Sequence, residues 1–488
     1  MSPRRGLVVL HIDGLGHDTL RRALDENRMP EVARLLDHEG YTLTGYRCGL
    51  PSTTPYAQAG ILYGDNREIP SFRWYDRDAG EVIQFGAAST FKRVAPKYFR
   101  GTRPLCEEGA CIAACYPAGA DETFGLSYRD REYSGTRANR SAGTVLARWV
   151  SNPAHLADLL GHGLLAVAGV TNNTLLERVA GRRPARSYVI ADMLEEVFLH
   201  HVTRFAVRQA MEAGYPVIYA GFYAYDETAH AFGPDDDYTR RMLMHVDHSI
   251  RAVADGRRDN PSGRRYELVV LSDHGNIPTR RFDESDGRSL GSLVAEWLPG
   301  TRVEEHNGKS FGPADVPQTR VVLTYSGGLG HLYFASFPDR LPLSEVRRRF
   351  PGLAERLAGL DRLAFVLGRD RGVNVAVTPA GDLRWGSEDA GEARELLARF
   401  DDPDRLARQL DRLNSFGRTG DLLVFGSYDG HTQVNLESQA GGHGSIGGEQ
   451  GHPFVLARPE WGIDTSQIED AFQLHPQLLD LRKRLTGK

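Results

Sequence analysis

The sequence predicts an α/β fold in which helices cover both faces of a mostly parallel central sheet. Strands buried on both faces are indicated by three apolar, β-branched runs that each end in a polar cluster: GLVVLHIDG (6–14), YPVIYAGFYAYD (215–226) and RYELVVLSDHG (265–275). Helical spacing with a glycine stop separates them, as in MPEVARLLDHEG (29–40) and DYTRRMLMHVDHSIRAVADG (237–256). Open parallel sheets bind ligands beyond the carboxyl ends of their strands, where these polar clusters fall.

The composition excludes several classes of protein. The chain has 488 residues, 41% of them apolar, which is enough for a large core. Lysine and arginine number 59 against 64 acidic residues, so the charge gives no sign of nucleic-acid binding. The start, MSPRRGLVVLHIDG, is too short and polar for a secretory signal peptide. The longest later apolar run, 159–170, is about half of the ~20 residues that a transmembrane helix needs. We therefore expect a cytoplasmic protein without a transmembrane segment.

The positions of the polar clusters predict an interrupted core. We expect residues 1–100, 213–280 and 420–488 to form the metal-binding core, with the sheet resuming at GDLLVFGSYDG (420–430). Residues 101–212 are interpreted as an inserted cap over the edge of the sheet that carries the site, where they would select the leaving group. Residues 281–419 are interpreted as a second insertion that is partly core.

The cysteines indicate no disulfide framework. Cys106, Cys111 and Cys115 cluster in CEEGACIAAC, whereas Cys48 stands apart, and no CxxC pair is present. Structural disulfides are rare in cytosolic proteins, so we expect buried free thiols. A redox pair or an adventitious metal site is the alternative.

Four short segments contain residue types that bind metal ions. They are HIDGLG (11–16), YDETAH (225–230), LSDHGN (271–276) and GGHGSIG (441–447). A catalytic pair of ions needs about six or seven ligands from several segments, and imidazole and carboxylate groups suit it. Asp226 and His230 alone would more simply be a surface pair. Four such clusters at expected strand ends and in a glycine-rich loop favour a metal site.

A candidate nucleophile lies in CGLPSTTPYAQAGILYGD (48–65). Thr54 precedes Pro55, and proline is favoured at the first helical position, so we expect Thr54 at the N-cap of a helix. A hydroxyl there faces free backbone N–H groups and the positive end of the helix dipole, which suits an alkoxide and a phosphate. A threonine that only caps the helix is the alternative, and Thr53 is the second candidate nucleophile.

The order of these motifs resembles the alkaline phosphatase superfamily, and most closely its type I phosphodiesterase / nucleotide pyrophosphatase branch. The matching segments extend from residue 6 to about 458. The resemblance implies two sets of ligands: Asp13, Thr54, Asp273 and His274 for one ion, and Asp226, His230 and His443 for the other. His443 is preferred to His452 because the late ligand of the family precedes a glycine and lies about ten residues before an apolar strand.

The resemblance also implies the cofactors and the mechanism. Two divalent ions are expected, and thiolate-free ligation rich in histidine favours Zn²⁺, with Mn²⁺ or iron as alternatives. Thr54 is expected to attack phosphorus and give a threonyl-phosphate intermediate that is then hydrolysed. The chain departs from the family at one position. The family usually has an asparagine about twenty residues after the nucleophile, whereas this chain has Phe72 there. Arg73 beside it is a candidate substrate-binding residue, or else a solvated loop residue.

The expected activity is cleavage of phosphodiester or pyrophosphate bonds in a small phosphorylated substrate, such as a nucleotide or a lipid head group. A phosphomonoesterase on the same scaffold, which Arg73 would favour, and a catalytically silent binding protein are the alternatives. A sulfatase is disfavoured, because LPSTTPYAQ lacks the modified Cys or Ser followed by x-Pro-x-Arg. His331, after a glycine-rich turn, is expected to be a satisfied loop histidine, with a place in the cleft as the alternative.

Overall fold

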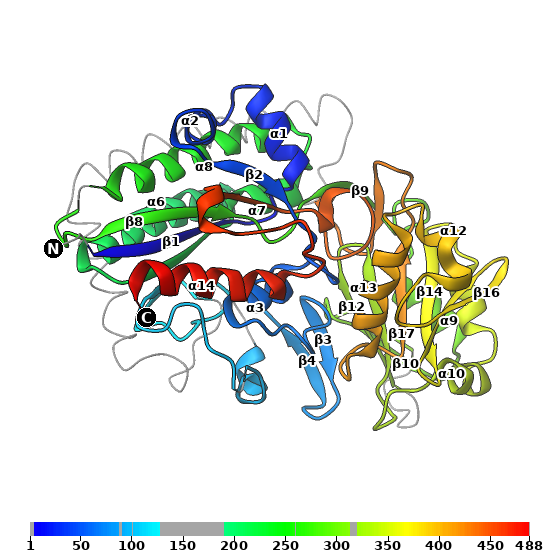
Figure 1. The fold of residues 1–488 in the computed structure, drawn as a ribbon. Helices are drawn as coiled ribbons and strands as arrows, with labels where there is room; N and C mark the ends of the chain where they lie inside the picture. The colour runs from blue at the N-terminus through cyan, green and yellow to red at the C-terminus, as the bar shows by residue number, and fades with distance from the viewer. Residues whose placement is uncertain are drawn as a thin grey trace.

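The computed structural model describes residues 4–86, 90–99, 101–126, 190–258, 260–312 and 320–487. Two large sheets lie in two lobes of the molecule, and both ends of the chain lie beside the first sheet (Figure 1). The apolar run 159–170 and much of the expected cap lie outside the described residues. Among the described residues, no helix combines the length and apolar character needed to cross a bilayer.

The central sheet has seven strands in the order β2-β20-β8-β1-β7-β5-β6, of which β8, β1, β7, β5 and β6 run parallel. β20 is antiparallel to both of its neighbours. The strands are β1 (Arg5–Ile12), β2 (Thr42–Gly45), β5 (Ala110–Ile112), β6 (Glu122–Phe124), β7 (Val217–Phe222), β8 (Arg265–Leu271) and β20 (Phe454–Ala457). The three longest strands are the three predicted apolar runs.

Helices cover both faces of this sheet, as the sequence predicts (Figure 1). One face carries α6, α8 and α2, and the other carries α14 and α3. Among the described residues, the helices of this lobe are α1 (His17–Asp25), α2 (Pro30–Glu39), α3 (Thr54–Tyr63), α6 (Ile190–Ala213), α7 (Ala224–Phe232), α8 (Asp237–Gly256) and α14 (Leu474–Thr486). The glycine stop of α2 is Gly40, in the left-handed conformation at φ 70° that glycine adopts readily.

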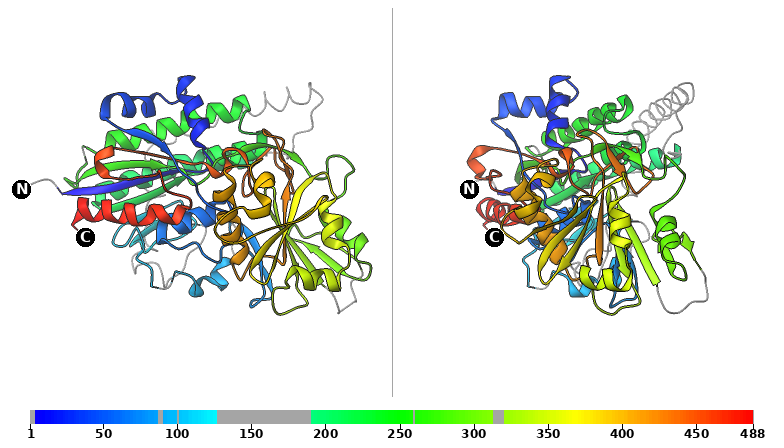
Figure 2. Two further views of the ribbon diagram at one scale, coloured as in Figure 1. Left: turned by 45° about the vertical axis from the view of Figure 1, so that its right-hand side comes forward. Right: turned by 90° about the vertical axis from the view of Figure 1, so that its right-hand side faces the viewer.

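The second sheet has eight strands in the order β11-β10-β12-β13-β17-β14-β15-β16, and it is mostly antiparallel (Figure 2). The strands are β10 (Arg302–Glu305), β11 (Ser310–Phe311), β12 (Arg320–Ser326), β13 (Leu329–Phe334), β14 (Leu363–Asp370), β15 (Val373–Thr378), β16 (Gly381–Trp385) and β17 (Leu422–Gly426). The helices of this lobe are α9 (Leu290–Trp297), α10 (Leu343–Arg349), α11 (Leu353–Ala358), α12 (Arg394–Leu397) and α13 (Pro403–Ser415).

The side chains of β17 show how this sheet joins the rest of the molecule. Leu423 and Phe425 pack in the core that is continuous with the first lobe, whereas Leu422 and Val424 belong to a separate core under α9, α10 and α11. The alternation is that of a strand whose two faces are both covered. The second sheet is therefore held firmly against the first lobe.

Two small sheets lie near the junction of the lobes in the described part of the chain. One is the antiparallel hairpin of β3 (Arg73–Asp76) and β4 (Glu81–Gln84). The other consists of β9 (Ile277–Arg281), which pairs in parallel with β18 (Gln433–Asn435) and antiparallel with β19 (Gly441–Gly442). All four cysteines are free and buried, which confirms the expectation for Cys48, Cys106, Cys111 and Cys115.

Two expected boundaries need correction. β5 and β6 lie in the segment 101–212, which was expected to be a cap, but they extend the central sheet. Each has only three residues, which is too short for hydrophobic periodicity to identify a strand. β17, in the expected core segment, belongs to the second sheet, and the central sheet resumes only at β20. A buried apolar run does not identify the sheet that it joins.

Candidate active site

Three neighbouring strands bring the predicted acidic residues to one edge of the central sheet. β1 lies between β7 and β8, and all three run parallel. Asp13 directly follows β1, and Asp273 follows β8 by two residues. Asp226 lies in the first turn of α7, which begins just after β7. The carboxyl ends of parallel strands meet at one edge, so residues far apart in the sequence become neighbours.

Asp226 and His230 lie one helical turn apart on α7, and the spacing of four residues places them on the same face. Nε2 of His230 is 3.1 Å from Oδ2 of Asp226. His443 follows β19 and completes this group: its Nε2 lies 3.2 Å from Nε2 of His230 and 3.7 Å from Oδ1 of Asp226. His452 lies elsewhere, against His17.

Thr54 is buried at the start of α3, with its hydroxyl oxygen 3.3 Å from Oδ1 of Asp13 and 3.1 Å from Nε2 of His274. The expected N-cap is shifted by one residue, because Thr53 is the N-cap and Thr54 is the first helical residue. Proline is accepted throughout the first helical turn, so Pro55 does not fix the cap position. The Thr54 hydroxyl is directed at these two side chains rather than at the backbone of its own helix.

The three histidines expected as ligands share one orientation. Their Nδ1 atoms lie against backbone carbonyl oxygens: His230 against Gly441 at 2.9 Å, His274 against Gly275 at 3.1 Å, and His443 against Ser52 at 2.8 Å. A carbonyl oxygen only accepts, so Nδ1 must carry the proton and Nε2 of a neutral ring carries the lone pair. Histidines that bind metals are usually held in this way.

Negative charge is concentrated among buried groups. Burial, followed by the charges of Asp273 and Asp226, raises the pKa of the Asp13 carboxyl well above its ordinary value. Burial opposes ionisation of Asp226, but the charges of His230 and His443 outweigh it and lower its pKa well below the usual range. Burial likewise disfavours protonated His230, but Asp226 raises the pKa of that histidine to about 10. Buried carboxylates in such numbers require compensating positive charge.

The donor set fits divalent cations. Three groups of residues each have possible ligand atoms within 4.8 Å of one another. The groups are Asp226, His230 and His443; Asp13, Asp226 and His274; and His11, Asp13 and Asp273. Imidazole nitrogens and carboxylate oxygens without thiolates are ligands of zinc, manganese and iron. All seven residues predicted as ligands therefore meet in one place.

Two further residues of the site were not singled out from the sequence. Asn276 donates a hydrogen bond of 2.7 Å from its Nδ2 to Oδ1 of Asp226. His11 lies with its Nε2 3.0 Å from Oδ1 of Asp273, and its Nδ1 lies 3.1 Å from the Gln58 amide nitrogen. Both residues stand within the segments HIDGLG and LSDHGN, so proximity to the ligands in sequence was the available signal.

The site opens into a cavity of about 280 Å³. Phe72, Arg73 and Glu437 form part of its wall beside Thr54 and His443. An adjoining cavity of about 330 Å³ shares Arg73 and Glu437 and extends toward the second sheet.

Arg73 is not a solvated loop residue. It is the first residue of β3, and its Nη1 lies 2.7 Å from Oε1 of Glu437. A charge-assisted hydrogen bond therefore already engages the guanidinium at the wall between the two cavities.

His331 also differs from the expected loop residue, because it lies inside β13 and is fully buried. Its Nδ1 accepts a hydrogen bond from the backbone N–H of Gly420.

A cluster of buried aspartates and histidines beside a helix-terminal threonine, at the carboxyl edge of a mostly parallel sheet, places the chain among the alkaline phosphatase-like folds. The sequence profile of the type I phosphodiesterase / nucleotide pyrophosphatase family matches residues 7–289. The chain therefore belongs to this family. No curated protein gives a significant sequence match.

Solved structures share the fold at low sequence identity. Phosphonoacetate hydrolase from Sinorhizobium meliloti 1021, in complex with phosphonoacetate, matches with 16% identity and a TM-score of 0.51 over 98% of this chain and 96% of that chain. Murine ectonucleotide pyrophosphatase / phosphodiesterase 5 matches with 12% identity and a TM-score of 0.51 over 98% and 95%. A mutant of the alkaline phosphatase PafA matches with 13% identity and a TM-score of 0.56 over 99% and 96%. Family and fold together indicate a hydrolase of phosphoryl compounds.

Proposed function

We propose that the chain is a two-metal phosphoryl-transfer hydrolase that cleaves phosphodiester or pyrophosphate bonds through a threonyl-phosphate intermediate. The observation that carries this proposal is the meeting of the seven expected residues at one edge of the central sheet, where five of them line one cavity. In the proposal, one ion is held by Asp13, Thr54, Asp273 and His274, and the other by Asp226, His230 and His443. Zn²⁺ suits these ligands best, and Mn²⁺ and iron are the alternatives. When bound, such ions lower the pKa of a hydroxyl nucleophile and neutralise charge on phosphoryl oxygens.

Thr54 is the proposed nucleophile. Its hydroxyl donates toward Asp13 at 3.3 Å, so the proton is directed to a carboxylate and the oxygen lone pairs remain free for phosphorus. A bond forms between Oγ1 and phosphorus as the bond from phosphorus to the leaving oxygen breaks. Water then cleaves the threonyl phosphate and restores the hydroxyl.

The start of α3 supports an anionic substrate at this position. Thr54 and the following residues form the first turn of a ten-residue helix, whose free N–H groups and positive dipole end favour phosphate. Burial lowers the pKa of His274 to about 4, even though Asp273 opposes this shift. His274 therefore stays neutral near pH 7 and keeps a lone pair on Nε2.

The proposed substrate is a small phosphorylated compound, a nucleotide or a lipid head group among the candidates. Murine ectonucleotide pyrophosphatase / phosphodiesterase 5 has been solved with AMP, and the Sinorhizobium enzyme with phosphonoacetate. The pairing of Arg73 with Glu437 offsets the charge that would attract a dianionic monoester, and so favours a diester. Arg73 as a substrate contact and a cytoplasmic location remain predictions.

The experiment that tests the function compares hydrolysis of bis-p-nitrophenyl phosphate and p-nitrophenyl phosphate by zinc-loaded protein, with a chelated sample as control. Faster diester cleavage that disappears on chelation would support the proposal. Faster monoester cleavage would support the phosphomonoesterase instead. Absence of both activities in a fully zinc-loaded protein would favour the silent binding protein.

A further inference from the structure

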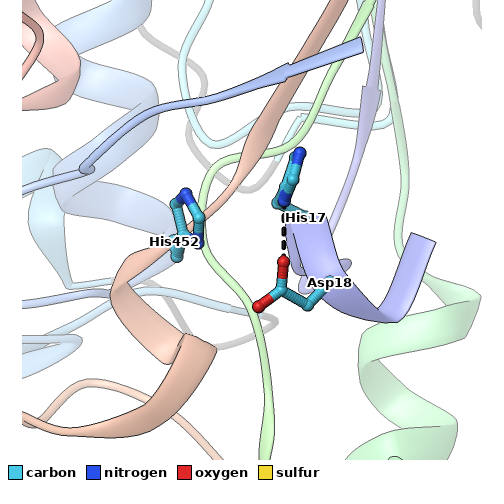
Figure 3. A group of neighbouring side chains, drawn as sticks. All are labelled: His17, Asp18 and His452. Carbon is cyan, nitrogen blue, oxygen red and sulfur yellow. Dashed lines mark hydrogen bonds and ion pairs between the residues drawn. The ribbon is translucent and has the colours of Figure 1, made fainter. Parts of the chain in front are cut away.

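A second group of potential metal ligands lies apart from the active site and consists of His17, Asp18 and His452 (Figure 3). His17 and Asp18 open α1, directly after the loop that begins with Asp13. His452 ends the glycine-rich segment that begins with His443 and leads into β20. The group shares no residue with the clusters of the active site.

Main-chain contacts hold the two histidines together. The backbone N–H of His17 donates to the carbonyl oxygen of His452 at 2.9 Å, and the ring centroids are 5.0 Å apart. The His452 ring also packs closely on β2, because a Cβ at Gly45 would lie 2.3 Å from its Nε2. The positions of both imidazoles are thus set by the backbone before any ligand binds.

The donor atoms lie close enough together for one ion to reach all three after a small rotation of Asp18. Nδ1 of His17 lies 2.8 Å from Oδ1 of Asp18, and one donor atom from each of the three residues lies within 4.8 Å of the others. Ligand atoms about 2.0–2.2 Å from a tetrahedral ion are about 3.3–3.6 Å apart, so the hydrogen bond between His17 and Asp18 would open when an ion binds. The Asp18 side chain is 58% exposed, so it can adjust by rotation.

The charges nearby allow a cation to bind. Burial, followed by the charges of Arg47 and His17, lowers the pKa of His452 to about 4, so its ring is neutral and has a free lone pair near pH 7. Burial opposes ionisation of Asp18, but its hydrogen bond with His17 lowers its pKa. The positive charge of Arg47 opposes a bound cation. Asp401 lies 3.4 Å from the Arg47 guanidinium, and its negative charge offsets part of this repulsion.

We propose that His17, Asp18 and His452 form a further site for a divalent ion of the Zn²⁺ type, which joins the start of α1 to the segment before β20. Two imidazoles and one carboxylate are a ligand set typical of zinc. Glu449 already joins the same two segments, since its carboxylate accepts from Thr19 N–H at 2.9 Å and pairs with Arg22 at 3.1 Å. An ion here would fix the far ends of the two loops that carry Asp13 and His443.

The test measures zinc bound per chain in the full-length protein after removal of metal and dialysis against micromolar free Zn²⁺. Asp18→Asn removes an exposed carboxylate without a large effect on folding, and His452→Ala removes a partly buried ligand. His38→Ala, at an exposed histidine of α2, is the matched control. We expect both site variants to bind one zinc fewer than the wild type and the control.

A second measurement separates binding at this site from binding elsewhere. Zn²⁺ should raise the thermal unfolding midpoint of the wild type more than that of Asp18→Asn, because an ion bound only to the folded state stabilises it. The comparison is a difference between variants, so it holds whatever number of ions the active site binds. Equal zinc content in all four proteins would overturn the proposal.

Discussion

Nε2 of His274 lies 3.1 Å from the hydroxyl oxygen of Thr54, although 220 residues separate the two in the chain. The opposite nitrogen of the ring is held by the Gly275 carbonyl, so the lone pair of His274 and the oxygen of Thr54 face the same space. The two atoms are hydrogen-bonded at this distance, and they are also placed so that one cation could be bound by both.

The nucleophile assignment predicts a large loss of activity when the Thr54 hydroxyl is removed. Thr54→Ala should lower kcat for the diester by on the order of 10³-fold or more, because the covalent step is lost. Thr54→Ser should retain activity within about tenfold, since it keeps the attacking oxygen. Thr53→Ala is the matched control, and steady-state kinetics is the measurement. Full activity of Thr54→Ala, or loss of activity only in the Thr53 variant, would contradict the assignment.

Metal removal should abolish activity, and Zn²⁺ should restore it. The His443→Ala variant should bind one ion fewer than the wild type, because only two protein ligands, Asp226 and His230, would remain at that position. Metal content per chain, measured beside activity, checks both statements. Undiminished hydrolysis by protein shown to be free of metal would rule out the two-metal mechanism.

Asn276 is predicted to act by positioning Asp226, which accepts its amide hydrogen bond. Groups that orient metal ligands typically contribute 10- to 100-fold in metal affinity. Asn276→Ala should therefore weaken zinc binding by about that factor and regain kcat at saturating Zn²⁺. A zinc titration of activity separates this outcome from a direct role in the reaction, which excess metal would not rescue.

Glu437 is predicted to control the preference between diester and monoester through Arg73. Glu437→Gln removes the partner charge of the guanidinium and should raise kcat/KM for the monoester relative to the diester by about tenfold, which corresponds to about 1.4 kcal/mol. Arg73→Met should not show this increase, and neither should the double variant. An unchanged ratio in Glu437→Gln would show that Arg73 does not contact the phosphoryl group.

His331 is predicted to make the fold sensitive to acid. Burial lowers its pKa to about 3, below the ~6.5 expected in the unfolded chain. As pH falls below about 6.5, the imidazole of His331 therefore binds a proton in the unfolded state but not in the folded state. The free energy of unfolding should decline by about 2 kcal/mol at pH 5 for this reason. Urea unfolding at pH 7 and pH 5 measures this loss, which should be smaller in His331→Gln. An equal loss in both proteins would assign the effect to other groups.

Much of the site could be predicted because buried parallel strands have a distinctive pattern. Each near-continuous apolar run ends in an acidic residue, and parallel pairing places those ends together. The turn spacing of Asp226 and His230 then identifies a pair of ligands on one helical face. Placement of His443 relied on the order of motifs, because the glycine-rich loop has no periodicity of its own.

Other features depend on contacts between distant segments. Nothing near Arg73 in the chain indicates that Glu437, which is 364 residues away, would bind its guanidinium. The sheet that β17 joins is also decided by its neighbours β13 and β14 rather than by its own residues. The shift of the N-cap from Thr54 to Thr53 is a smaller error of the same kind, since local preferences fix helix ends only to within one or two residues.

The position of β20 has a consequence for biosynthesis. This late strand lies between β2 and β8, so a nascent chain that has not yet released residues 454–457 from the ribosome has β8 as an open sheet edge. Unpaired edges recruit other strands, and the growing polypeptide is therefore exposed to aggregation until this strand is inserted. His443 emerges only shortly before it, so the last ligand and the strand that closes the edge become available in the same late interval of translation.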